Sequence, residues 1–105
     1  MKLNKVHTGW AVDSIAKASA SFAVLGYGAL GSVCEDLHRG VRLLLISNHH
    51  GDTIELVEPL NVDSPVSALL EKNGPAPYHV CYSLSKIEWK EYEGKVKAEG
   101  FIILH

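Results

Sequence analysis

Histidine is the most conspicuous residue type in this 105-residue chain, because it occurs six times, at positions 7, 38, 49, 50, 79 and 105. Imidazole exchanges protons near neutral pH and is a common metal ligand. Two of the six, His7 and His79, lie in segments rich in β-forming residues, and so does one glutamate, Glu55. Two imidazoles and a carboxylate suit a divalent first-row metal ion such as Zn, Co, Ni, Mn or Fe(II). The residue types therefore raise the hypothesis of a shared metal site.

The spacing of polar and apolar residues places the two histidines on open strand faces. Side chains alternate across a strand, so His7 shares a face with the small residue Gly9, and His79 shares one with Cys81. The opposite faces carry aromatic and aliphatic side chains, which a covering helix requires. We therefore expect both histidines to line one concavity, on the side of the sheet away from those helices.

Glu55 lies between two apolar residues, Ile54 and Leu56, in a segment typical of a buried strand. If these two face a helix, Glu55 faces the side where the histidines are expected. Burying a carboxylate is costly unless it is paired, protonated or bound to a cation. We therefore predict that His7, Glu55 and His79 hold one divalent metal ion. The alternative is hydrogen-bonded structural histidines and a solvent-facing glutamate.

Length and composition restrict the class of protein that carries this site. A chain of 105 residues with 47% hydrophobic and 21% charged residues is typical of one globular domain. Its formal net charge of -2 lacks the basic excess that nucleic acid or an anionic membrane requires. No run reads as a membrane span or a secretory signal, and two cysteines make no disulfide framework. We expect a cytoplasmic protein.

The first sixty residues predict a βαβββ unit. Asp13 is a suitable N-cap for a helix that ends at Gly26. The strands around this helix are expected over 6–12, 27–34, 41–47 and 53–59.

The remaining residues predict a linker helix and a second, shorter βαβ unit. The linker helix is expected to begin at Ser64 and Pro65 and to end at Asn73 and Gly74. After it come a strand over 78–84, a helix from the capping box of Ser85 and Glu88 to about Glu99, and an extended segment over 101–104. We therefore divide a single domain, 1–105, into module one (1–60), a linker helix (61–76) and a partial module two (77–105).

The two units also resemble each other in sequence. At an offset of 72 residues, a histidine, an aromatic residue, a small residue, an aliphatic residue, a helix cap and an isoleucine recur in the same order around His7 and His79. This pattern indicates a weak internal repeat in which the two histidines are equivalent.

Four segments together resemble the vicinal oxygen chelate superfamily, which includes the glyoxalases, and most of all its methylmalonyl-CoA epimerases. They are His7-Thr8-Gly9-Trp10-Ala11-Val12, Gly51-Asp52-Thr53-Ile54-Glu55-Leu56-Val57-Glu58-Pro59-Leu60, Ser64-Pro65 and Tyr78-His79-Val80-Cys81-Tyr82. The resemblance implies an α+β fold of paired βαβββ modules in a curved, half-open mixed sheet, with the second module shortened to βαβ. It also implies that His7, Glu55 and His79 are the metal ligands.

The sequence departs from the family pattern at two places. The family's fourth metal ligand is an acidic residue in the last strand of module two, and the position equivalent to Glu55 falls beyond the last residue of this sequence. The epimerases also carry a carboxylate just before the Gly-Val that opens the third strand, where this chain has His38 and Arg39. His38 is therefore a candidate catalytic base, and Glu35, Asp36 or no residue are the alternatives.

The resemblance further implies a reaction. The metal would chelate two neighbouring oxygens of an acyl-CoA or oxo-acid substrate and stabilise the enolate formed on deprotonation, which describes an isomerase or a lyase. Glu55 would serve this catalysis as a metal ligand. Open strand edges favour a homodimer. The alternatives are a bleomycin-resistance-like protein that binds a small molecule without turnover, and an accessory protein of the same fold.

Other signals have plainer interpretations. Residues 26–31 have the letters of a dinucleotide motif, but a helix precedes them and strand-like residues follow, the reverse of the order that the motif needs. His49 and His50 are expected at a solvated hairpin tip. A small buried thiol is the commoner role for Cys81 than a nucleophile or ligand. The basic residues, Arg39 among them, either solvate the surface or meet an anionic substrate.

Overall fold

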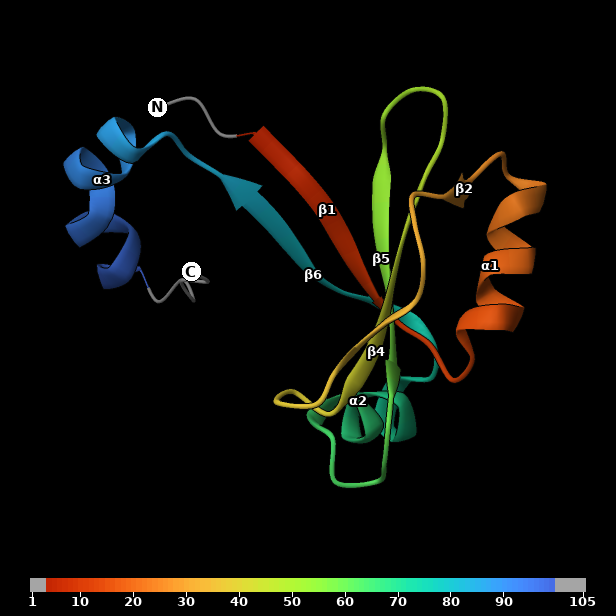
Figure 1. The fold of residues 1–105 in the computed structure, drawn as a ribbon. Helices are drawn as coiled ribbons and strands as arrows, with labels where there is room; N and C mark the ends of the chain where they lie inside the picture. The colour runs from red at the N-terminus through yellow and green to blue at the C-terminus, as the bar shows by residue number, and fades with distance from the viewer. Residues whose placement is uncertain (1–3, 100–105) are drawn as a thin grey trace.

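The computed structural model describes residues 4–99 and shows an α+β fold (Figure 1). Its elements are β1 (Asn4–Ala11), α1 (Ile15–Val24), β2 (Gly28–Ala29), β3 (Cys34–Asp36), β4 (Val41–Ser47), β5 (Thr53–Pro59), α2 (Pro65–Asn73), β6 (Ala76–Ser83) and α3 (Lys86–Ala98). The extended segment expected over 101–104 lies outside the described residues. Across residues 4–99, every helix is too short or too polar to cross a bilayer.

The strands form one open, mixed sheet, as expected. Its order is β2-β4-β5-β1-β6, with β3 also paired to β4. Strand β1 is parallel to β5 and antiparallel to β6, whereas β4 is antiparallel to its neighbours. The three strands β5, β1 and β6, which carry the candidate ligands, are therefore adjacent.

Two apolar clusters pack on opposite faces of this sheet. One, against α1, contains Val12, Ile15, Leu44, Ile46, Ile54 and Leu56, with Trp10 and Phe22 at its margin. The other, against α2, contains Ala11, Val41, Val57 and Val66. Leu56 is completely buried, and removing such a side chain from water contributes about 2 kcal/mol. Because Ile54 and Leu56 face α1, Glu55 points to the face on which Val57 packs against α2.

Helix α1 begins one residue later than expected. Ser14, not Asp13, is the N-cap, and its hydroxyl accepts a hydrogen bond from the backbone N–H of Lys17. Glu58 of β5 supplies a second acceptor, because its carboxylate takes the N–H of Ile15 at 2.8 Å. Asp13 and Ser14 are both suitable N-cap residues. The helix begins after Ser14, where the Ile15 N–H also binds Glu58 of β5.

The prediction of one continuous extended segment over 27–34 is wrong. Within it, Gly28–Ala29 form a strand with β4, the Leu30 N–H donates to the Leu45 carbonyl at 2.9 Å, and strand pairing with β4 resumes at Cys34–Asp36. Between them the chain bends, and Gly31 adopts a φ of 154°, a conformation that favours glycine. A stretch rich in glycine and serine lacks side chains that pack on a sheet, so most of it leaves the ladder.

The linker helix has the predicted limits. Ser64 is the N-cap of α2, Pro65 occupies the first turn, and Gly74 ends the helix with a φ of 69°. Helix α3 likewise begins after the predicted cap, since the Ser85 hydroxyl accepts the N–H of Glu88 at 3.2 Å. Local signals of this kind depend only on neighbouring residues, which explains the agreement.

Strands β1 and β6 pair in a register that is symmetric under exchange of the two repeats. The register joins His7 to Cys81, Thr8 to Val80, and Gly9 to His79. Thr8 and Val80 are equivalent at the offset of 72 residues, so a local two-fold axis passes through that pair. Exchanging each residue for its equivalent converts the His7 pair into the His79 pair. The weak sequence repeat therefore corresponds to a real two-fold arrangement of these strands.

The prediction that a helix covers the outer face of β6 is also wrong among the described residues. Helix α3 contributes no residue to either cluster, and it extends away from the sheet (Figure 1). Ile87 is 81% exposed, whereas its repeat equivalent in α1, Ile15, is 5% exposed. Val80 and Tyr82, on the outer face of β6, are 47% and 54% exposed. Among the described residues, the core belongs to the first unit and the linker helix.

Candidate metal site

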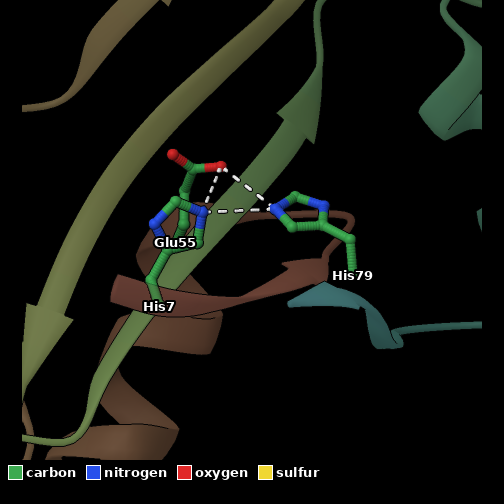
Figure 2. A group of neighbouring side chains, drawn as sticks. All are labelled: His7, Glu55 and His79. Atoms are coloured by element: carbon green, nitrogen blue, oxygen red, sulfur yellow. Dashed lines mark hydrogen bonds and ion pairs between the residues drawn. The ribbon is translucent and has the colours of Figure 1, made fainter. Parts of the chain in front are cut away.

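Three neighbouring strands each supply one side chain to the candidate metal site. Glu55 of β5, His7 of β1 and His79 of β6 point toward one another (Figure 2). His7 Nε2 lies 3.3 Å from His79 Nε2. Glu55 Oε1 lies 3.6 Å from His7 Nε2 and 3.7 Å from His79 Nε2. The structure thus brings together the three residues that the sequence singled out.

The three atoms form a nearly equilateral triangle whose edges suit one ion. A first-row metal bonds to imidazole nitrogen and carboxylate oxygen at about 2.0–2.2 Å, so neighbouring ligands lie roughly 3.0–3.5 Å apart. The observed separations of 3.3, 3.6 and 3.7 Å differ from this range by a few tenths of an ångström at most. The two distances from Glu55 are also longer than ordinary hydrogen bonds. The donor set therefore fits a divalent ion.

The site is partly screened from water. The exposed fractions of the His7, Glu55 and His79 side chains are 13%, 14% and 31%. Burial lowers the pKa of His79 below its ordinary value; the Glu55 carboxylate opposes this, whereas His7 and Arg39 add to it. A lowered pKa keeps the His79 imidazole neutral at physiological pH. The neutral ring is the form that binds a metal.

Tyr78 stands beside the site. Its ring meets the His79 imidazole edge-on, with the ring centroids 4.4 Å apart. Burial, and then the negative charge of Glu55, raises the pKa of Tyr78 to about 12, so its phenol stays protonated. Tyr78 and His79, together with Thr8, Pro77 and Val80, line an open depression of about 400 Å³.

Arg39 adds a positive charge near the site. It lies in the turn 37–40 between β3 and β4, where Asp36 accepts hydrogen bonds from its Nε at 2.7 Å and its backbone N–H at 3.1 Å. Asp36 has the largest effect on the pKa of Arg39, raising it, and Glu55 and Tyr78 raise it further. An anion that approaches the three candidate ligands would therefore also meet the field of this guanidinium.

The candidate bases lie in and before this turn, outside the group of three. Glu35 pairs with Arg42 at 3.2 Å, and Asp36 pairs with Arg39 at 2.7 Å. His38 is exposed, and its described electrostatic neighbour is Asp36. The structure thus places His38 in the same turn as Arg39, without a contact to Glu55.

The other histidines and the thiol do not join the group. His49 and His50 are exposed at the tip of the β4–β5 hairpin, with ring centroids 4.0 Å apart. Cys81 is half-buried, and within residues 4–99 it is not part of a metal-binding cluster. His105 lies outside the described residues. In the dinucleotide-like stretch, α1 precedes Gly26 and the short β2 follows, so the helix that the motif requires after its glycines is not formed.

Sequence reasoning assigned no role at this site to Tyr78 and treated Arg39 as one of several surface cations. Tyr78 alternates with His79 along β6, which predicts the opposite face of the strand. The register of β1 and β6 shifts between Gly9 and Trp10, beside this point, and such an irregularity redirects side chains. Neither the shift nor the position of the turn at Arg39 has a signal in local sequence.

Comparison with known proteins supports one family. The sequence profile of the Glyoxalase/Bleomycin resistance protein/Dioxygenase superfamily matches residues 6–101. A search of curated proteins finds no significant sequence match. The matched range includes all three candidate ligands.

Solved structures share the fold over nearly all of this chain. A hypothetical protein from Bacillus halodurans C-125 superposes with a TM-score of 0.79 and 26% identity, covering 100% of this chain and 74% of that one. Methylmalonyl-CoA epimerase from Mycobacterium tuberculosis superposes with a TM-score of 0.78 and 20% identity, covering 96% of this chain and 67% of that one. Streptomyces coelicolor methylmalonyl-CoA epimerase in complex with 2-nitronate-propionyl-CoA superposes with a TM-score of 0.76 and 21% identity, covering 99% of this chain and 77% of that one. The expected glyoxalase-like fold is therefore confirmed.

The electrostatic environment of His79 yields a pH prediction. Because the Glu55 carboxylate raises the pKa of His79 against the effect of burial, Glu55→Gln should lower that pKa further in metal-free protein. An NMR titration of the His79 ring protons measures it. Glu58→Gln is the matched control, because Glu58 lies on the same strand but binds the start of α1, and it should leave the His79 titration unchanged. A higher or unaltered pKa in Glu55→Gln would contradict the described geometry.

Proposed function

Because the chain belongs to the Glyoxalase/Bleomycin resistance protein/Dioxygenase superfamily, we propose that it binds one divalent metal ion through His7, Glu55 and His79. The proposal rests on one observation, the triangle of 3.3, 3.6 and 3.7 Å between two imidazole nitrogens and one carboxylate oxygen. Zn, Co, Ni, Mn and Fe(II) all accept this donor set. Three protein ligands leave coordination positions for a substrate.

We propose an acyl-CoA or an oxo-acid as the substrate, and an isomerase or lyase reaction. When bound, a divalent ion supplies Lewis-acid stabilisation of negative charge on substrate oxygens. Arg39 attracts an anionic substrate, because its charge acts at Glu55 and His79. Tyr78 shields one side of His79 from water with a phenol that stays protonated. Several structural neighbours are methylmalonyl-CoA epimerases, which supports the acyl-CoA alternative.

His38 is the proposed base. Glu35 and Asp36, the other candidates, are each engaged by an arginine, whereas His38 is exposed, and histidine is the side chain that most often serves as a general base. In this step His38 removes the proton from the carbon next to the acyl carbonyl, and the electron pair of the broken C–H bond moves onto the carbonyl oxygen. The electron pair then returns to the α-carbon, a water molecule protonates the opposite face, and the resulting hydroxide takes up the proton held by His38, which completes an epimerisation.

A second function on the same fold is the binding of a small molecule without turnover. The observation that favours it is the lack of a described contact between His38 and the three candidate ligands. The open depression beside His79 would then hold the ligand. An accessory role, in which the three residues only pack, is the third alternative from the sequence.

Metal binding gives the first test. We expect one Zn²⁺ or Co²⁺ per chain by calorimetry on tag-free protein, and a loss of affinity of more than about 100-fold in His7→Ala or His79→Ala, since even residues that only support ligands cost 10–100-fold. Affinity should fall as pH decreases, because protons compete for the imidazoles. His49→Ala and His50→Ala are controls that should bind normally. Stoichiometric binding in the His7 and His79 variants would refute the site.

The reaction is tested with methylmalonyl-CoA in deuterated water. Metal-loaded protein should incorporate deuterium at the α-carbon, and His38→Ala should abolish this while keeping metal affinity. Arg39→Gln should raise KM more than it lowers kcat, because it removes attraction rather than the base. Stoichiometric metal without exchange on acyl-CoA or oxo-acid substrates would favour the non-catalytic alternative.

We also propose a homodimer. Within residues 4–99, β6 pairs only with β1, and an unpaired strand edge readily accepts another strand. The exposed Val80, Tyr82 and Ile87 lie on β6 and α3 of what we propose is the start of module two, 77–105. Module one, 1–60, and the linker, 61–76, would contribute the packed core. Light scattering should give twice the chain mass at micromolar concentration, and a single-chain mass would contradict the dimer.

The proposed location is the cytoplasm, where cysteines stay reduced. Cys34 and Cys81 are both free, and Cys34 is exposed.

A further inference from the structure

Gly9 lies directly beneath the imidazole of His79. The two residues are cross-strand partners in the β1–β6 ladder, and Gly9 is buried. A Cβ atom built on Gly9 would lie 2.5 Å from His79 Nδ1 and closer still to Cε1 and Nε2. Real Cβ atoms essentially never approach other atoms within 3.0 Å. The ring of His79 therefore occupies the space that any side chain at position 9 would need.

The distance that His79 must span explains this contact. His79 is on β6 and Glu55 is on β5, with β1 between them. Neighbouring strands lie about 4.7–4.9 Å apart, so these two backbones are separated by roughly 9–10 Å. The imidazole must lean across β1 to bring Nε2 within 3.7 Å of Glu55 and 3.3 Å of His7. Its path crosses β1 at Gly9.

The backbone of Gly9 does not itself require glycine. Its φ is not among the positive values found at Gly26, Gly31, Gly40, Gly51 and Gly74. The atoms that a Cβ at position 9 would meet first all belong to the His79 ring. An alanine therefore fits the strand conformation, and its nearest conflict is with the His79 ring.

The repeat supplies an internal comparison. Cys81 is the equivalent of Gly9 at the offset of 72 residues, and it faces His7 as Gly9 faces His79. A side chain is thus tolerated opposite His7. His7 is on β1, next to β5, so it reaches Glu55 across one strand spacing rather than two. Of the two equivalent positions, 9 and 81, position 9 alone must therefore lack a side chain.

From this arrangement we infer that Gly9 is a positioning residue, which opens the path by which the His79 imidazole reaches His7 and Glu55. Its consequence for metal affinity rests on the proposed function, whereas its effect on the ring does not. A methyl group at position 9 turns the imidazole away from His7 and Glu55, and leaves two of the three ligand atoms together. The fold is kept, because the displaced group is a side chain at the open side of β6.

The inference is tested first in metal-free protein by NMR. In the wild type, the Gly9 Hα protons should show nuclear Overhauser effects to the His79 ring protons and an upfield ring-current shift that His79→Ala removes. In Gly9→Ala, contacts between the His7 and His79 rings should disappear. Wild-type spectra without the contact between Gly9 and His79, or unaltered ring contacts in Gly9→Ala, would overturn the inference.

Metal affinity provides the second measurement. Gly9→Ala should weaken Zn²⁺ binding at least about tenfold, and the Co²⁺-loaded protein should show the changed visible spectrum of a site that has lost a nitrogen ligand. In a His79→Ala background, Gly9→Ala should have no further effect, because the conflicting ring is gone. An equal loss in both backgrounds would mean that Gly9 acts through the strand and would refute the positioning role.

Matched glycines control for the substitution itself. No atom lies within 4 Å of a Cβ built on Gly28 in β2 or Gly94 in α3, and neither has a positive φ. Gly28→Ala and Gly94→Ala should leave the His79 resonances and Zn²⁺ affinity unchanged. If the wild type shows the contact between Gly9 and His79 but binds no metal, the proposed function fails and the positioning role stands.

Discussion

The pairing of β1 with β6 is the constraint on which the candidate site depends. It places Thr8 opposite Val80, and this one register sets Gly9 under His79 and His7 opposite Cys81. Because β1 also pairs with β5, three donor atoms from distant parts of the chain meet on one face. A slip of one residue between β1 and β6 would turn His79 to the other face and dissolve the cluster. The apolar clusters stabilise the sheet, but the ladder decides which polar groups meet.

Burial of Glu55 is the energetic cost that this arrangement carries. The side chain is 14% exposed, and its Oε1 atom lies beyond hydrogen-bonding distance of both imidazoles. Leaving a carboxylate poorly paired in such surroundings destabilises a fold, whereas a divalent ion between the three atoms would offset the penalty. Glu58, three residues along the same strand, shows the alternative, since its carboxylate is satisfied by the Ile15 N–H at 2.8 Å and by Arg42 at 2.9 Å.

Sequence predicted the parts of this molecule that depend on neighbours in the chain. Alternation around Glu55 gave its face correctly, and Ser64 and Gly74 gave the limits of α2. The errors occur where a distant strand decides. Glu58 binds the N–H of Ile15 where α1 begins at Ser14 rather than Asp13. Residues 27–34 can pair only with β4, which follows them in the chain, and they do so at Gly28–Ala29 and again from Cys34. The path of the His79 ring over Gly9 depends on the order of the strands in the sheet, and the position of Tyr78 accompanies the register shift between Gly9 and Trp10; no local pattern encodes either.

The local two-fold axis through Thr8 and Val80 has a consequence for the orientation of a ligand. The backbone positions of the two histidines are related by that axis, but within residues 4–99 the acidic group is present on the β5 side alone. The surroundings of the axis are therefore asymmetric. Glu55 lies on one side, and Tyr78 and the depression beside His79 lie on the other. A molecule bound beside the three candidate ligands would find its two ends in unlike surroundings. Two strands that pair almost symmetrically would thus give a bound molecule one favoured orientation, because exchanging its two ends would exchange a carboxylate neighbour for a phenol ring.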